Sequence, residues 1–327
     1  MKMSIKKRLP QPHKIVILQE SFLNESQLNK LRRLGVMRAY NATETIQEAK
    51  KRLARATIAV IDSYTVPVAE ELLDAAKKLR YVCLLSTGFD KVDLDAAHAR
   101  GIKISNIPEY AATAVAEHTF ALLFSLVRNV IPLNSEMKKR PFDIDQTDLT
   151  KYKFIGAELR NKKIGIIGIG RIGKAVAKIA SAFGMEVLAY DPYVKKTSIA
   201  KLAPLVRLLR ESDIITLHAP LSTNQKPILT KKEIALMKKS AIIINTARAK
   251  LIDEQALISA LKNKKIMAAG LDVIENISKN NQILKLKNVI VTPHSAWFTK
   301  EACANLADTI IANIESFAAG KPRNTII

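Results

Sequence analysis

Three polar residues follow apolar segments in the second half of the chain, and their side chains suit chemistry at a carboxylate and an adjacent carbonyl. They are Arg248, Asp272 and His294, which come after the apolar segments 241–245, 266–271 and 289–291. A guanidinium binds a carboxylate and polarises a carbonyl oxygen, whereas a histidine exchanges protons near neutral pH. Arg248 and His294 would therefore serve hydride transfer to a 2-oxo acid, provided that a hydride carrier binds beside them.

A glycine-rich turn offers a site for such a carrier. The apolar segment 164–167 runs into Gly168-Ile169-Gly170-Arg171-Ile172-Gly173, and a helical pattern follows. Gly168 permits a tight turn, Gly170 lets the backbone approach a pyrophosphate, and Gly173 lets helix and strand pack closely. The free N–H groups at the start of the helix favour an anion. The turn therefore predicts a dinucleotide-binding site.

Asp191 indicates which dinucleotide binds. It ends the next apolar segment, 186–190, 18 residues after Gly173. A carboxylate at this point accepts hydrogen bonds from the hydroxyls of an adenosine ribose and repels a 2′-phosphate. We therefore predict NAD rather than NADP as the cofactor; the alternative is a glycine turn with an ordinary capping aspartate.

The elements that position these residues alternate between apolar β-branched segments and helical patterns, which is typical of parallel βα units. The predicted fold is α/β, with two doubly wound parallel-sheet domains. A discontinuous, flavodoxin-like substrate domain comprises residues 1–112 and 300–327, and a Rossmann NAD-binding domain comprises residues 113–299. Strands are expected at 14–18, 57–61, 81–86, 103–107, 164–167, 186–190, 214–218, 241–245, 266–271 and 289–291.

The connections between the domains are expected to differ in character. A long apolar helix is predicted at 113–130, with Pro132 ending or kinking it, and a polar loop at 134–152. A last helix at 300–319 returns to the first domain.

No apolar segment is long enough to span a membrane, and Cys83 and Cys303 form neither a disulfide framework nor a metal site. We expect a cytoplasmic protein.

The net charge of +22 is the most unusual bulk property of the chain. Clustered lysines would indicate nucleic-acid binding, but here they are scattered as short pairs on expected polar faces. A solvated basic surface is therefore favoured over a nucleic-acid partner.

With these residues in place, the sequence resembles the D-isomer-specific 2-hydroxyacid dehydrogenases, a family that includes glycerate, lactate and phosphoglycerate dehydrogenases. The similarity covers about residues 57–309, and many motifs occur in the right order. Besides the glycine turn, they are Ser86-Thr87-Gly88-Phe89-Asp90-Lys91-Val92-Asp93, Asn106-Ile107-Pro108, Ala114-Val115-Ala116-Glu117-His118-Thr119, His218-Ala219-Pro220-Leu221, Asn245-Thr246-Ala247-Arg248, Gly270-Leu271-Asp272-Val273 and Pro293-His294-Ser295.

This resemblance implies a role for each candidate residue. Arg248 would hold the substrate carboxylate and carbonyl, and His294 would be the acid in reduction and the base in oxidation. The backbone N–H groups of Thr87 and Gly88 would complete the carboxylate site. The resemblance also implies a homodimer formed through the cofactor domain. The remaining implied contacts are to the cofactor: Asp272 and the backbone around Thr246 to the nicotinamide amide, Arg171 and Ile172 to the pyrophosphate, and Asp191 to the ribose.

Two positions depart from the family pattern. Ile277 stands where the family places a glutamate that pairs with the catalytic histidine, five residues after Asp272. Glu275 is the nearest substitute, and we hypothesise that it fills this role; a carboxylate there would favour the protonated histidine. Ala249 and Lys250 replace two glycines that commonly follow the arginine.

Each assignment also has a structural alternative. Arg248 could pair with Glu254 or cap a helix, and His294 could be a buried histidine held by Thr292. His218 either lines the nicotinamide pocket or is a structural residue at a strand end. His118 is expected to be a packing or hinge residue. For the whole chain, the alternative is an NAD-binding regulatory protein, similar to the corepressors of this family, with weak or no dehydrogenase activity.

Overall fold

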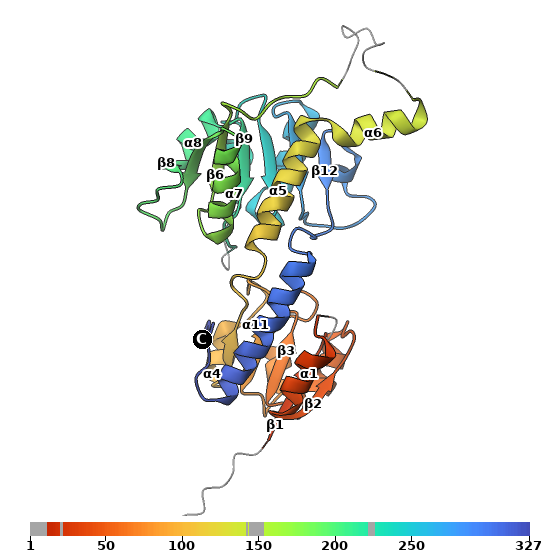
Figure 1. The fold of residues 1–327 in the computed structure, drawn as a ribbon, viewed down its shortest axis with the longest axis vertical. Coiled ribbons are helices and arrows are strands. Elements are labelled where there is room, and N and C mark those ends of the chain that lie inside the picture. Colours follow the sequence, from red (N-terminus) through yellow and green to blue (C-terminus); the bar gives the residue numbers. More distant parts are fainter. Residues whose placement is uncertain (1–11, 20–21, 142, 144–153, 222–225) are drawn as a thin grey trace, which may run out of the picture. The chain divides into compact units, whose positions relative to one another are not determined.

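The computed structural model of the protein describes residues 12–19, 22–141, 143, 154–221 and 226–327. Its internal contacts divide the chain into two compact units (Figure 1). The first unit comprises Met1–Tyr110 and Thr299–Ile327, and the second comprises Ala111–Phe298. The chain therefore leaves the first unit once and returns to it through its last helix.

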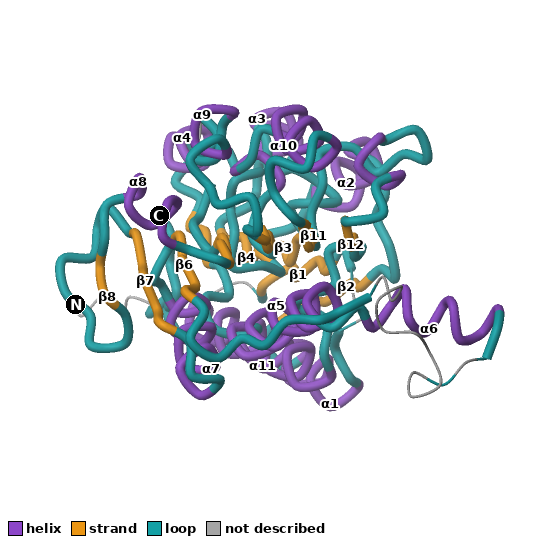
Figure 2. Tube along the Cα trace, turned by 90° about the horizontal axis from the view of Figure 1, so that it is seen from above, coloured by secondary structure: helices purple, strands orange, loops and turns teal. Residues whose placement is uncertain are grey.

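The first unit contains a five-stranded parallel sheet with the order β2-β1-β3-β4-β5. This is the order of flavodoxin-like domains. Helices α1 and α11 lie on one side of the strands, and α2, α3 and α4 lie on the other (Figure 2). The strands are β1 His13–Ile17, β2 Gly35–Ala39, β3 Ile58–Ile61, β4 Tyr81–Leu84 and β5 Lys103–Ser105; the helices are α1 Glu25–Arg32, α2 Ile46–Leu53, α3 Glu70–Ala75, α4 Leu94–Ala99 and α11 Lys300–Ala318.

The second unit contains a seven-stranded parallel sheet with the order β12-β11-β10-β9-β6-β7-β8. Strands β6 and β9 are neighbours although β7 and β8 lie between them in sequence, so the order reverses at this point. Such a switch point is where open α/β sheets place ligands, beyond the carboxyl ends of the strands. The strands are β6 Lys163–Ile167, β7 Glu186–Tyr190, β8 Lys201–Leu202, β9 Ile214–Leu217, β10 Ile242–Asn245, β11 Ala268–Leu271 and β12 Val289–Val291.

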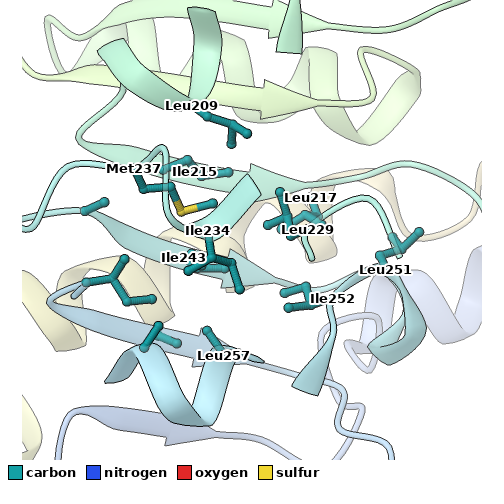
Figure 3. Packing of buried hydrophobic residues seen from close by; sticks show 14 of the residues in the cluster. Leu209, Ile215, Leu217, Leu229, Ile234, Met237, Ile243, Leu251, Ile252 and Leu257 are labelled. Atoms are coloured by element: carbon teal, nitrogen blue, oxygen red, sulfur yellow. The ribbon is translucent and has the colours of Figure 1, made fainter. Parts of the chain in front are cut away.

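Helices cover both faces of this second sheet. Helices α5 and α7 pack together on one face, and α9 and α10 on the other (Figure 2). On the second face, Leu209, Ile215, Ile243 and Leu257 form part of a continuous apolar core (Figure 3). The helices are α5 Ala112–Val127, α6 Val130–Lys139, α7 Arg171–Ala182, α8 Leu205–Glu211, α9 Lys231–Ile234 and α10 Glu254–Lys262, with short 3-10 turns η3 Ala249–Leu251 and η4 Gln282–Lys285.

The two parallel sheets, each with helices on both faces, confirm the predicted fold class. Two short strands were missing from the prediction. Strand β2 is half-exposed and pairs with β1 at the sheet edge, and β8 has two residues. Neither carries the run of buried apolar residues that identified the other strands.

The structure corrects the sequence prediction for the segment after the long apolar helix. A loop was predicted at 134–152, and this prediction is wrong for residues 134–139, which belong to helix α6. Pro132 lies in the first turn of α6, where an N–H has no partner within the helix, so its missing hydrogen does not break the helix. Residues 142 and 144–152 lie outside the described part of the chain.

Within the described residues, no single helix is long and apolar enough to cross a membrane. Helices α5 and α6 pass that test only as a pair that is bent by 56°, and only by length and composition. Helix α5 is a core helix of the second unit, since Ala116, Phe120 and Leu123 on it are buried.

Candidate active site

The glycine turn lies between β6 and α7, as predicted, and each glycine has its own steric reason. A Cβ on Gly168, whose φ is +92°, would lie 2.7 Å from the backbone nitrogen of Ala219. A Cβ on Gly173 would lie 2.1 Å from the carbonyl oxygen of Gly168. By contrast, a Cβ on Gly170 would meet nothing within 4 Å. Packing therefore demands two of the glycines, whereas Gly170 borders open space at the start of α7.

The residues of that first helical turn fit a pyrophosphate. Gly170 is the N-cap of α7, and Arg171 and Ile172 are its first two residues. No side chain caps the helix, and the N–H groups of a first turn have no partners within the helix. A dinucleotide phosphate can accept hydrogen bonds from these groups and interact with the positive end of the helix dipole.

Asp191 links the end of β7 to the glycine turn. Its Oδ2 accepts a hydrogen bond from the N–H of Ile169 at 3.0 Å, and its Oδ1 accepts one from the N–H of Tyr193 at 2.9 Å. Each carboxylate oxygen can accept a second hydrogen bond. Asp191 thus has a structural partner on each side and still has lone pairs for a ligand, so its role towards a ribose stays a prediction.

His218 follows β9 and borders the same turn. The carbonyl carbon of His218 would lie 2.7 Å from a Cβ on Gly168. Its Nε2 lies 2.8 Å from Thr216 Oγ1, and burial lowers the pKa of His218 to about 3. The imidazole is therefore neutral at physiological pH. The hydrogen bond to Thr216 agrees with the structural alternative, and contact with a nicotinamide stays a prediction.

The loop that carries Arg248 is folded by the side chain of Asn245, at the end of β10. Asn245 Nδ2 donates to the carbonyl of Arg248 at 2.9 Å, and Oδ1 accepts from the N–H of Ala247 at 3.0 Å. Thr246 is buried, and its hydroxyl lies 3.2 Å from that of Thr119 on α5. The guanidinium of Arg248 donates to the carbonyl of Ala247 at 2.9 Å through Nη1.

The loop that carries His294 is folded around Asp272, at the end of β11. Asp272 Oδ1 accepts hydrogen bonds from the Thr292 hydroxyl at 2.6 Å and from the N–H of Ser295 at 2.9 Å. Its Oδ2 accepts from the N–H of Ala296 at 2.9 Å, and its carbonyl accepts from the N–H of His294 at 2.9 Å. The backbone of His294 adopts a left-handed conformation, with φ of 57°.

This arrangement gives Asp272 a task that sequence reasoning missed. Its carboxylate is fully buried, and its hydrogen bonds go to the loop of His294. The expected contact with a nicotinamide amide therefore stays a prediction, while the structural task is plain. An aspartate in the family motif carried no signal that three donors from residues 292–296 would converge on it.

Glu275 is not brought to His294. Its backbone N–H donates to Glu254 Oε2 at 2.8 Å, and its side chain is exposed and makes no hydrogen bond or ion pair within the described residues. Glu254 also accepts from Asn281 Nδ2 at 3.0 Å, so it anchors this loop. Ile277 is 79% exposed. The hypothesis that Glu275 pairs with His294 therefore stays a prediction without a supporting contact.

In the first unit, Thr87 and Gly88 lie just beyond the end of β4. Thr87 Oγ1 donates to the carbonyl of Ile107 at 2.6 Å, and Asn106 Nδ2 donates to the carbonyl of Thr87 at 2.7 Å. Ser86 Oγ donates to the carbonyl of Gly88 at 2.7 Å. These bonds occupy carbonyls, whereas the N–H groups of Thr87 and Gly88 have no acceptor among the described residues. Two adjacent free donors suit a carboxylate.

A cavity of about 940 Å³ lies elsewhere, at the amino ends of β10, β11 and β12. Its lining combines lysines with apolar side chains, among them Lys239, Lys264, Lys287, Ile266, Met267 and Leu286. The candidate residues follow the carboxyl ends of the same strands. The cavity is therefore separate from the candidate active site.

Comparison with known proteins connects this geometry to a family. A family model described as the NAD-binding domain of D-isomer-specific 2-hydroxyacid dehydrogenases matches residues 120–296. A glycerate dehydrogenase from Methylorubrum extorquens is 39% identical over 291 residues, which are 88% of this chain and 90% of that protein.

Two solved structures share the whole fold. One is an acyclic imino acid reductase in complex with NADPH and D-Arg, which is 36% identical, with a TM-score of 0.89 over 96% of this chain and 100% of that one. The other is D-lactate dehydrogenase from Aquifex aeolicus complexed with NAD and lactic acid. It is 31% identical, with a TM-score of 0.82 over 94% of this chain and 96% of that one.

Proposed function

Because this chain belongs to the D-isomer-specific 2-hydroxyacid dehydrogenases, which are NAD-dependent oxidoreductases, we propose that it interconverts hydroxypyruvate or glyoxylate and the corresponding 2-hydroxy acid. The observation that supports the proposal is that the candidate residues share one side of the second sheet, where its parallel strands end. The glycine turn, the Arg248 loop, Asp272 and the His294 loop all follow carboxyl ends of parallel strands of this sheet. A carboxylate-binding cation and a proton donor thus belong to the same edge as the dinucleotide site.

We propose that the first unit contributes to substrate binding and that the second binds NAD. NAD, when bound, supplies or accepts the hydride at the C2 carbon of the substrate. The guanidinium of Arg248 binds the substrate carboxylate and polarises the carbonyl, and the N–H groups of Thr87 and Gly88 complete the carboxylate site. His294 gives a proton to the carbonyl oxygen in reduction and takes it back from the hydroxyl in oxidation.

The cofactor preference is proposed from Asp191. With one hydrogen bond to each oxygen, its carboxylate keeps its place beside the glycine turn. A 2′-phosphate at this point would be repelled, so NADH is preferred to NADPH. No observation in the described residues favours a regulatory protein without dehydrogenase activity.

The test measures NADH oxidation, with NADPH in parallel, against hydroxypyruvate, glyoxylate, pyruvate and longer 2-oxo acids. We expect turnover with hydroxypyruvate or glyoxylate that is lost in His294→Ala, while this variant still binds NADH. Replacing His98, an exposed histidine of α4, by alanine is the matched control and should leave turnover unchanged. Turnover of only 2-oxo acids supplied with ammonia or an amine would refute the proposal and indicate imino acid reduction. Tight NADH binding without any turnover would favour the regulatory alternative.

We also propose a cytoplasmic homodimer joined through the second unit. Helix α6 contains no buried residue, and Val130 and Ile131 on it are 53% and 50% exposed. Exposed apolar side chains on a helix without a buried residue favour a partner surface. Light scattering after gel filtration should give twice the mass of the chain, and Val130→Lys with Ile131→Glu should reduce it to that of a monomer. An unaltered mass of one chain in the wild type would contradict the dimer.

A further inference from the structure

Three side chains connect helix α5 to the loop of His294. His118 Nε2 on α5 lies 2.9 Å from Thr292 Oγ1 and 3.5 Å from Asp272 Oδ1. The hydroxyl of Thr292 lies 2.6 Å from the same Asp272 oxygen. A helix, a strand end and a loop that are far apart in the sequence therefore meet in one hydrogen-bonded cluster.

The direction of each hydrogen bond follows from the number of protons available. A carboxylate only accepts, so the single hydroxyl proton of Thr292 points to Asp272. The Thr292 oxygen must then accept from His118, which means that Nε2 of His118 carries a proton. The order is His118 to Thr292 to Asp272, and Asp272 in turn accepts the N–H groups of Ser295 and Ala296.

We propose that His118 is a positioning residue for His294 and acts through Thr292 and Asp272. The other donors to Asp272 come from residues 292–296, so they join the loop to the end of β11 but do not tie it to α5. His118 supplies that tie from α5. The tie matters because His294 holds a left-handed backbone, a conformation that is unfavourable for most L-amino acids.

The position of the cluster in the chain adds a second reason. Helix α5 begins at Ala112, two residues after Tyr110, where the N-terminal segment of the first unit ends. The second unit ends at Phe298, four residues after His294. The hydrogen bond from His118 to Thr292 therefore joins the two segments through which the second unit continues into the first. A displacement of either segment would otherwise move His294, and small misplacements of a reacting group cost large factors in rate.

This inference rests on the proposed function, and its test separates the two. His118→Leu keeps an apolar stem of similar bulk but cannot donate, whereas His118→Gln can donate an amide proton. We expect His118→Leu to lower kcat about 10-fold, the loss of one well-placed hydrogen bond, with the Kd for NADH changed less than about 2-fold. His118→Gln should recover most of that loss. His98→Leu is the matched control for the same chemical change at an exposed site.

A double-mutant cycle with Thr292→Val separates the chain of hydrogen bonds from general packing. If His118 acts through the Thr292 hydroxyl, the double variant should lose no more kcat than Thr292→Val alone. Additive losses, an unchanged kcat in His118→Leu, or a loss that His118→Gln does not restore would each overturn the proposal.

A measurement that does not require turnover tests the positioning role even if the protein reduces none of the proposed substrates. The NMR signals of the His294 ring, assigned by their loss in His294→Ala, should shift in His118→Leu and return towards the wild-type position in His118→Gln. Signals that stay in place in both variants would overturn the positioning role. A wild-type protein without turnover on any 2-oxo acid would refute the proposed function and leave this spectroscopic test intact.

Discussion

Replacing Asp272 by asparagine should destabilise the second unit and disorganise the loop of His294. The side chain has the same shape, but one oxygen becomes an amide nitrogen. The amide of the asparagine can take two orientations. The less destabilising one keeps the oxygen towards Thr292 and Ser295 and turns the nitrogen towards the N–H of Ala296. Two donors then face each other in a site that is fully buried.

The expected magnitude follows from these three hydrogen bonds. Leaving one buried donor unpaired costs about 1–3 kcal/mol, and replacing a charged acceptor by a neutral one weakens each of the other two bonds by about 1 kcal/mol. The free energy of unfolding should therefore fall by about 3–5 kcal/mol. For a unit of this size, that corresponds to a fall in Tm of about 10 °C.

Urea unfolding followed by circular dichroism measures this change, and kcat is measured on the folded fraction at low temperature. Asp253→Asn is a matched control, because Asp253 caps helix α10 through the N–H of Ala256 and asparagine caps equally well. We expect it to change stability by less than about 0.5 kcal/mol. An Asp272→Asn variant within about 1 kcal/mol of the wild type and fully active would refute the view that Asp272 organises this loop.

Three further predictions follow from the cofactor edge of the sheet. Gly173→Ala should unfold or strongly destabilise the second unit, because its Cβ would lie 2.1 Å from the Gly168 carbonyl oxygen. Gly170→Ala should fold normally but bind NADH at least about 10-fold more weakly, which a fluorescence titration would show. Asp191→Ala should raise the KM for NADH and bring the kcat/KM ratio of NADH to NADPH nearer to one; an unchanged ratio would contradict the ribose contact. His218, with a pKa of about 3 in the folded state, takes up its proton mainly on unfolding, so stability should fall as the pH drops from about 6.5 towards 3, by up to about 1.4 kcal/mol per pH unit. His218→Asn should remove that part of the slope in urea titrations at several pH values, and an identical slope would show that His218 is not enclosed.

The prediction of elements was most accurate where the signal is local. Strands β7 and β12 have the bounds expected from their apolar residues, and the glycine turn lies between a strand and a helix. The prediction was least accurate where neighbouring strands decide whether a segment forms a strand. Strand β2 forms because β1 offers a free edge. Gly35 allows this pairing because it has no Cβ, and a Cβ there would lie 2.0 Å from the His13 carbonyl oxygen. No periodicity in residues 35–39 carries that information.

Taken by itself, the sequence determined the parallel α/β class, the dinucleotide turn and the candidate residues at strand ends. These depend on short-range patterns, on side-chain types and on the rule that parallel strands present their carboxyl ends at one edge. Only the tertiary structure decided what these residues touch. It folds the His294 loop around Asp272, folds the Arg248 loop around Asn245, and leaves Glu275 on the surface. Such choices depend on which donors and acceptors converge from distant segments, because a buried polar group takes its partner from whatever the packed chain brings within about 3 Å.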